Sequence, residues 1–180
     1  MRRDARTASA QKRGCRRCSG NDFGARRAHR AVRAVVQGTG SALRIEVARF
    51  STELDQSPAL RSAIFRYISV FMSQLALTAT CTRFHTVEAR LARWLLMTRD
   101  QARSDQFYLT QEFMAYMLGV RRVGVTCAAR ELRARRLVRY IRGRINMLDV
   151  RGLENASCSC YASAKNAYTR FMHPNPAATQ

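Results

Sequence analysis

The sequence predicts a mainly α-helical protein with a small β-wing near its carboxyl end, and three observations lead to this fold class. Residues 58–83 contain no glycine and no proline after Pro58, as a long central helix requires. Residues 111–126 carry two apolar stripes at three- and four-residue steps with a glycine between them. Residues 137–148 alternate apolar and polar side chains around a glycine-containing turn. We therefore expect a long central helix followed by a winged helix-turn-helix, with a disordered basic arm at the N-terminus.

Residues 1–30 are predicted to be this disordered basic arm. They are rich in arginine, alanine, serine and glycine, and they have almost no apolar periodicity. The arm lacks the apolar core of a secretory signal, so we expect no export and a cytoplasmic location. The same composition would also result from a truncated or frame-shifted gene.

Residues 31–57 are expected to supply two strands, around Ala34-Val35-Val36 and over Leu43–Val47. Two strands do not close a barrel or a roll. A hairpin of this size is marginally stable unless it docks on another element.

Residues 58–83 are predicted to form the central helix, with Ser57 as its cap and Pro58 in its first turn. At 1.5 Å per residue the helix would be on the order of 40 Å long. It carries a broad apolar stripe made of Leu60, Ile64, Tyr67, Ile68, Phe71, Leu75 and Ala79. We interpret it as a dimerisation helix, with a simple core helix as the alternative. The uncharged window between Arg66 and Arg83 falls short of about 20 residues and contains several polar side chains, so a membrane span is not expected.

Residues 84–157 are predicted to form the winged helix-turn-helix, and its first helix begins after Thr86, which can cap it. Glu88 lies in the first turn, where the helix dipole favours a carboxylate. Val87, Leu91, Trp94 and Leu95 point to one side of this helix. We expect Trp94 to be a core anchor rather than a platform on which bases stack.

The helix-turn-helix itself is predicted over Gln111–Thr126 and the residues that follow. Ala115 is small enough to let a second helix cross closely, and Gly119 makes the turn because glycine adopts a left-handed conformation without steric cost. The inward-facing apolar residues are Met114, Leu118, Val120, Val125, Ala128 and Leu132. The alternative interpretation is an ordinary pair of packed helices with a solvated arginine face.

The outer face of the second helix is predicted to read DNA. Arg122, Thr126 and Arg130 recur every four residues and therefore project together, opposite the apolar stripe. In the proposed mechanism the helix from Arg121 to Arg135 lies in the major groove and Arg121 holds the sugar-phosphate backbone.

The wing is predicted from two alternating segments, Leu137–Ile141 and Arg144–Leu148, joined by a tight turn at Arg142-Gly143. Arg142 and Arg144 would lie at its tip, beside the DNA backbone. A third strand is expected at Gln106–Leu109. Thr110, which can cap the first reading helix, completes the predicted DNA-binding residues.

With these elements in place, residues His85 to Tyr161 resemble the C-terminal half of a Crp/Fnr-type bacterial transcription regulator. The resemblance rests on Val87–Leu96, Leu109–Phe113, Met117–Arg122, Leu137–Tyr140, Arg142–Ile145 and Gly152–Glu154. It implies a homodimer with an N-terminal β-roll that resembles cyclic-nucleotide-binding domains, a dimerisation helix and a winged helix. It also implies that Arg122 reads guanine and that RNA polymerase is a candidate further partner. Val123 and Cys127 depart from the family pattern, which often has an acidic residue and a further arginine there.

By the same resemblance, residues 31–57 would be the remnant of a β-roll effector domain. Such a domain needs about 110 to 120 residues, and fewer than 60 precede Pro58. We therefore do not predict cyclic-nucleotide binding or any other cofactor.

The cysteines do not predict a metal site. Cys15 and Cys18, Cys158 and Cys160, with His173, could in principle supply tetrahedral ligands, but nothing in the sequence brings them together. The spacing of an iron–sulfur site is also missing. Cys81 and Cys127 are expected to be small, half-buried helix residues, and residues 158–180 a flexible tail.

The predicted function is sequence-specific binding of double-stranded DNA and transcription regulation as a homodimer. The formal charge of +20 agrees with a nucleic-acid partner. No Gly-rich phosphate loop, HExxH or nucleophile elbow occurs, so an enzyme is not predicted. The alternatives are a non-specific DNA or RNA binder that uses the basic arm, and a truncated regulator without function.

Overall fold

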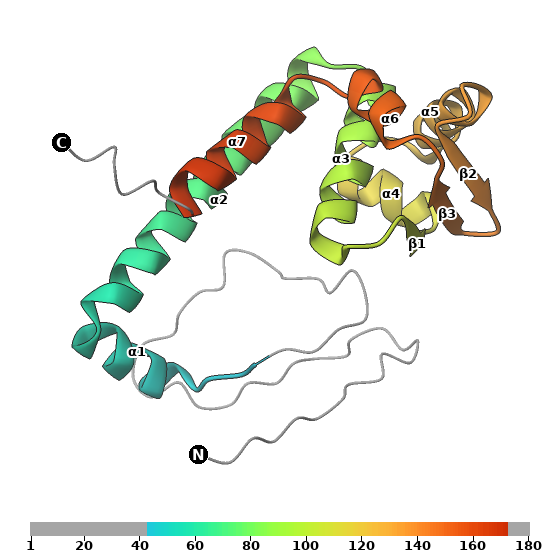
Figure 1. Cartoon of the computed structure of the whole chain (residues 1–180). Coiled ribbons are helices and arrows are strands. Elements are labelled where there is room, and N and C mark those ends of the chain that lie inside the picture. The colour runs from blue at the N-terminus through green and yellow to red at the C-terminus, as the bar shows by residue number, and fades with distance from the viewer. Residues whose placement is uncertain (1–42, 173–180) are drawn as a thin grey trace. The chain divides into compact units, whose positions relative to one another are not determined.

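The computed structural model describes residues 43–172, and these divide between two compact units, Met1–Phe50 and Ser51–Gln180. Figure 1 shows the elements of the second unit, in which α2 is followed by a small helical domain with a three-stranded sheet. This mainly helical architecture with a small wing confirms the predicted fold class. The predicted arm at residues 1–30 and the predicted strand near Ala34 lie outside the described residues.

The second predicted strand of the β-roll remnant is not present. Residues 43–46 have no regular structure, and α1 runs from Val47 to Gln56. Val47, Phe50 and Leu54 follow one another at three- and four-residue steps, which suits a helix. A strand would instead need a hydrogen-bonded neighbour, and no described segment pairs with residues 43–47.

The long helix α2 spans Pro58–Phe84, within one residue of the predicted range. The Ser57 hydroxyl accepts a hydrogen bond from the Leu60 amide at 3.2 Å, as an N-cap does. By length and composition alone α2 could cross a membrane, but core helices of soluble proteins meet the same criteria. Only Val70 and Cys81 are buried along its length, so most of the apolar stripe is uncovered in the single chain.

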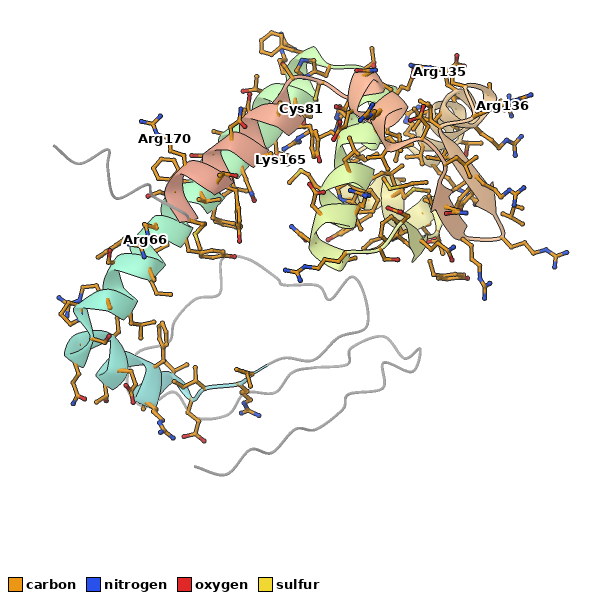
Figure 2. The ribbon with its side chains drawn as sticks, in the orientation of Figure 1. Arg66, Cys81, Arg135, Arg136, Lys165 and Arg170 are labelled. Atoms are coloured by element: carbon orange, nitrogen blue, oxygen red, sulfur yellow. The ribbon has the colours of Figure 1, made fainter. Side chains whose placement is uncertain are left out.

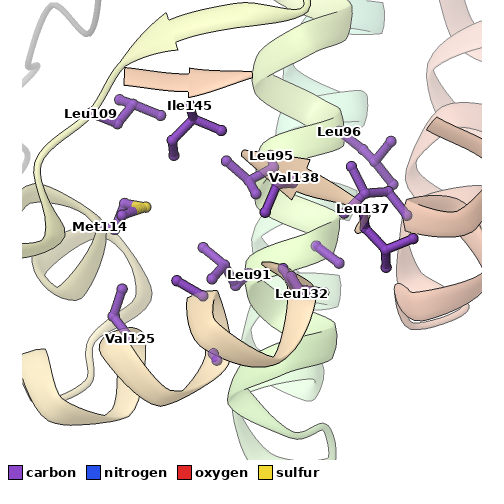
Figure 3. Close-up of a cluster of buried hydrophobic side chains, with 14 of the residues drawn as sticks. Leu91, Leu95, Leu96, Leu109, Met114, Val125, Leu132, Leu137, Val138 and Ile145 are labelled. Carbon is purple, nitrogen blue, oxygen red and sulfur yellow. The ribbon is translucent and has the colours of Figure 1, made fainter. Parts of the chain in front are cut away.

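The winged-helix core forms where four helices and the sheet meet. Helix α3 (Val87–Ala102) packs against α5 (Arg122–Ala134) and α6 (Val150–Ala156), and α4 (Gln111–Leu118) closes one side. Figure 3 shows Leu91 and Leu95 of α3 among side chains from α4, α5 and the sheet. Trp94 packs against this core and lies 6.2 Å from the Phe113 ring, which confirms its role as an anchor.

The sheet has the order β1-β3-β2 and is antiparallel throughout. Its strands are β1 (Gln106–Tyr108), β2 (Val138–Ile141) and β3 (Arg144–Met147). Arg142 and Gly143 both have positive φ, 47° and 83°, as the two-residue turn of a tight hairpin requires. The predicted wing and its third strand are therefore confirmed.

Residues 160–172 do not form the flexible tail that the sequence predicted. They form α7 (Cys160–Met172), which packs along α2 (Figure 1). Tyr161 and Ala164 are buried at a three-residue step, and the Tyr161 hydroxyl donates a hydrogen bond to Asp100 Oδ2 at 2.9 Å. The helix is stable here because these contacts come from α2 and α3, which lie far away in the sequence.

Candidate nucleic-acid interface

The turn between α4 and α5 has the conformation that the sequence predicted. Thr110 caps α4 by accepting a hydrogen bond from the Phe113 amide at 3.1 Å. Gly119 ends the helix in the left-handed conformation, with φ 62° and ψ 38°. The Val120 amide then donates to the Ala115 carbonyl at 3.1 Å, which closes the turn. The two helices are thereby held at a sharp corner.

A buried arginine of α3 supports the corner between α4 and α5, and this role was not predicted from the sequence. Arg90 of α3 is buried, and its guanidinium donates a hydrogen bond to the Leu118 carbonyl at the end of α4. A cation at a helix C-terminus can donate a hydrogen bond to a free carbonyl group, and its charge interacts favourably with the negative end of the helix dipole. Arg90 looks like a surface residue in the sequence, and only the helix end that it meets in space reveals its role.

The inner face of α5 is buried as predicted, because Val125, Ala128 and Leu132 all lie in the core. On the other side, Arg122 and Arg130 are exposed. Val123 is 71% exposed on this outer surface, and Cys127 is exposed as well, rather than half-buried as expected. The helix is therefore divided into an apolar face and a basic face with two smaller exposed groups on it.

None of the predicted DNA-binding arginines is neutralised by an acid of residues 43–172. The ion pairs within this range join Arg99 to Asp100 and Asp105, and Arg135 to Glu88. Arg121, Arg122 and Arg130 of the α5 region, and Arg142 and Arg144 of the wing, take part in no such pair and are exposed. Figure 2 shows many nitrogen-tipped side chains that project from this part of the molecule. We refer to these five arginines as the basic ridge.

Two residues of the predicted reading helix are engaged inside the protein. The half-buried Thr126 hydroxyl lies 3.0 Å from both Gln111 Oε1 and the Arg122 carbonyl, to which it can donate. The Gln111 carboxamide, at the start of α4, is thus held beside the outer face of α5, although Gln111 is not among the predicted DNA-binding residues. Arg135 follows the end of α5, and its Nη1 donates to Glu88 Oε1 at 2.9 Å, which ties this end of α5 to α3.

Residues 89–156 match the Crp-like helix-turn-helix domain. A Crp/Fnr-family transcriptional regulator from Eubacterium rectale is similar to the chain at 21% identity and a TM-score of 0.47, over 59% of this chain and 50% of that one. The Thermus thermophilus catabolite activator protein is similar at 18% identity and a TM-score of 0.37, over 66% and 50% of the two chains.

The chain thus spans about half the length of these solved structures. Among curated protein sequences, no match to the chain was found. The domain match supports a role in DNA-binding transcription regulation.

Proposed function

We propose that this chain, which carries a Crp-like helix-turn-helix domain at residues 89–156, binds specific sites on duplex DNA as a homodimer and regulates transcription. The basic ridge is the observation that carries this proposal. Five arginines on one helix-turn-helix and its wing have no acidic partner among residues 43–172, and they lie on the two elements with which such a module contacts base edges and phosphates.

Helix α5 is the proposed reading element. Arg122 and Arg130 would approach base edges or nearby phosphates, and a bidentate contact to guanine suits the fork of a guanidinium. The exposed Val123 side chain offers an apolar contact of the kind that a thymine methyl group accepts. Thr126 acts mainly by holding Gln111, whose amide nitrogen can then donate to DNA.

The remaining sites are proposed to hold the sugar-phosphate backbone. Arg121 stands at the N-terminus of α5, and Arg142 and Arg144 stand at the tip and base of the wing turn. Thr110 begins α4, where free amides and the helix dipole favour a phosphate. These contacts would set the register of the protein without reading sequence.

Helix α2 is the proposed dimer interface. Its exposed apolar side chains include Phe65 at 63% and Met72 at 59%, in a continuous series with Tyr67, Ile68, Phe71 and Leu75. A second copy would remove this surface from water, which is favourable. A dimer would present two reading helices to half-sites about 34 Å apart.

The test is selection of genomic fragments that the full chain binds, followed by competition binding and a mass measurement in solution. We expect a dimer that prefers a selected site over bulk DNA by about a thousandfold or more. Equal affinity for selected and random DNA would refute specific regulation. In that case deletion of residues 1–30 identifies the alternative, because a binder that acts through its basic arm would lose all affinity.

A further inference from the structure

Four side chains that bind metals in other proteins meet where α2 ends and α7 begins. Cys81 lies in the last turn of α2, His85 follows that helix, and Cys158 and Cys160 stand at the start of α7. One ligand atom from each residue lies within 4.8 Å of the other three. Figure 2 marks Cys81 in the region where α2 and α7 run together. Cys81 was predicted to be half-buried, but it is only 1% exposed.

We propose that Cys81, His85, Cys158 and Cys160 form a tetrahedral binding site for one zinc ion. A zinc ion with Zn–S bonds of about 2.3 Å holds its sulfur ligands about 3.8 Å apart, and a nitrogen ligand somewhat closer. The distance from Cys81 Sγ to Cys158 Sγ is 3.4 Å, and that from Cys160 Sγ to His85 Nδ1 is 3.7 Å. Both distances differ from the zinc geometry by only a few tenths of an ångström, so small shifts of the side chains would let the four donors hold a single ion.

The local structure explains why these donors converge. The His85 amide donates to the Cys81 carbonyl at 3.1 Å, so the two residues are one helical turn apart at the end of α2. The Tyr161 amide donates to the Cys158 carbonyl at 3.0 Å, which forms the turn that leads into α7. Because α7 packs along α2, the two pairs face each other. Such an arrangement depends on contacts between residues 77 positions apart.

The donor set favours one zinc ion over other metals. Three thiolates and an imidazole are ligands of structural zinc sites, and closed sites of this kind need no water ligand. An iron–sulfur cluster places several atoms between its protein ligands, so it needs a wider spacing than this one. Leu77 and Ala89 pack against the three cysteines and supply the apolar shell that shields such a site.

A buried arginine next to the cluster would balance the negative charge of a zinc–thiolate site. Zinc with three thiolates and a neutral histidine carries a net charge of −1, and a buried charge of this kind needs a partner. Arg93 of α3 is 6% exposed, and its positive charge partly opposes the rise that burial causes in the pKa of Cys81 and of Cys160. Its Nη2 donates to Thr78 Oγ1 at 3.3 Å, whereas its Nε has no hydrogen-bond partner among the residues that the structure describes. A metal–thiolate centre would give this guanidinium a counter-ion.

Burial works against the ionisation of Cys81 and Cys160 in the metal-free protein. Burial, followed by the hydrogen bond to Cys158, raises the pKa of Cys81 to about 11, and burial also raises that of Cys160. Zinc must displace these protons as it binds, which is the usual behaviour of cysteine sites. Simple packing of small side chains would explain buried thiols, but it does not require four donor atoms to converge on one point.

A bound ion would connect the end of α2 to the start of α7, next to the start of α3. Its role would be to fix the junction between the long helix and the winged helix. This inference is independent of the proposed DNA binding, since the ligands lie outside the basic ridge.

Metal analysis of the full chain provides the test. Protein purified under reducing conditions with zinc is expected to retain one zinc per chain, and Co²⁺ in its place should give the intense visible bands of a tetrahedral thiolate site. In chelator competition, Cys81→Ser, His85→Gln, Cys158→Ser or Cys160→Ser should each weaken zinc binding by about 100-fold or more, because four ligands share the affinity of such a site. Circular dichroism of each variant reports whether it folds.

Two matched controls separate this site from other cysteines of the chain. Cys127→Ser changes an exposed cysteine on α5, and the double variant Cys15→Ser/Cys18→Ser changes the N-terminal pair. Both should retain zinc with unchanged affinity. Loss of zinc from the double variant, unchanged affinity in the ligand variants, or wild-type protein without zinc or tetrahedral Co²⁺ bands would each overturn the proposal.

Alkylation of the wild-type chain gives a test that does not depend on the folding of variants. Zinc should slow alkylation of Cys81, Cys158 and Cys160, while the exposed Cys127 reacts at the same rate with and without the ion. Equal rates at the three buried cysteines in both conditions, or a Cys81–Cys158 disulfide in place of bound metal, would contradict the site.

Discussion

Replacing Arg122 by alanine should weaken binding to a specific DNA site without unfolding the protein. The Arg122 side chain is exposed and forms no ion pair within residues 43–172, so its removal should change the free energy of unfolding by less than about 0.5 kcal/mol. A guanidinium that contacts a base edge contributes about 1–3 kcal/mol to discrimination, which corresponds to a loss of roughly 5- to 150-fold in affinity. The variant should also tolerate another base pair at one position of the selected site.

The matched variant is Arg142→Ala, at the tip of the wing. If Arg142 contacts only a phosphate, its loss should lower the affinity for specific DNA and for random DNA by a similar factor. It should also reduce the slope of log affinity against log salt by about 0.9. Fluorescence anisotropy with a selected site and a scrambled site, over a series of salt concentrations, measures both effects. Arg135→Ala serves as a control, because Arg135 is bonded to Glu88 and lies outside the basic ridge. Equal losses on both DNAs for Arg122→Ala and Arg142→Ala would refute the division into reading and backbone contacts.

Three further predictions concern stability and assembly. Leu91→Ala removes a side chain that is 1% exposed in the core, so urea unfolding should show a loss of about 2–5 kcal/mol; a loss below about 1 kcal/mol would mean that the core is packed differently. Gly119→Ala should destabilise the protein by about 1 kcal/mol because φ of Gly119 is +62°. Gly124→Ala, in open space within α5, should instead stabilise the protein by about 0.5–1 kcal/mol. Thermal melts in which both variants change stability in the same direction would contradict the turn geometry. Phe65→Glu combined with Met72→Glu should convert a dimer to a monomer by light scattering, since both side chains are exposed on α2, and a dimer that persists would exclude this face as the interface.

Much of the structure of residues 84–157 was predictable, because the sequence signals for its helix ends and turns are local. A cap such as Thr110 and a turn such as Gly119 act on residues no more than about four positions away, so their identity and spacing are visible in the sequence. The alternation of the wing is equally local, and its turn at Arg142-Gly143 is formed by two adjacent residues. The same holds for the limits of α2, where Ser57 and Pro58 begin the helix.

The incorrect predictions concern segments whose structure depends on a neighbour that is distant in the sequence. Residues 43–47 favour a strand by composition, but a strand without a partner is not stable, and α1 forms from Val47 onward. Residues 160–172 look like a tail, yet Tyr161 finds Asp100 of α3 and the helix packs on α2. Periodicity cannot predict such docking, because the partner surface is more than 50 residues away.

The winged helix-turn-helix, the limits of the long helix and the positions of the basic ridge could be predicted from the order of the amino acids, because each follows from spacings within one or two helical turns. The packing of the helices in space was needed to show that Arg90 supports the end of α4, that Thr126 holds Gln111, and that α7 lies along α2. It alone brought Cys81 and His85 to Cys158 and Cys160. The physical reason is that these contacts join side chains from different elements, and their distances are set by how the helices pack rather than by any pattern along the chain.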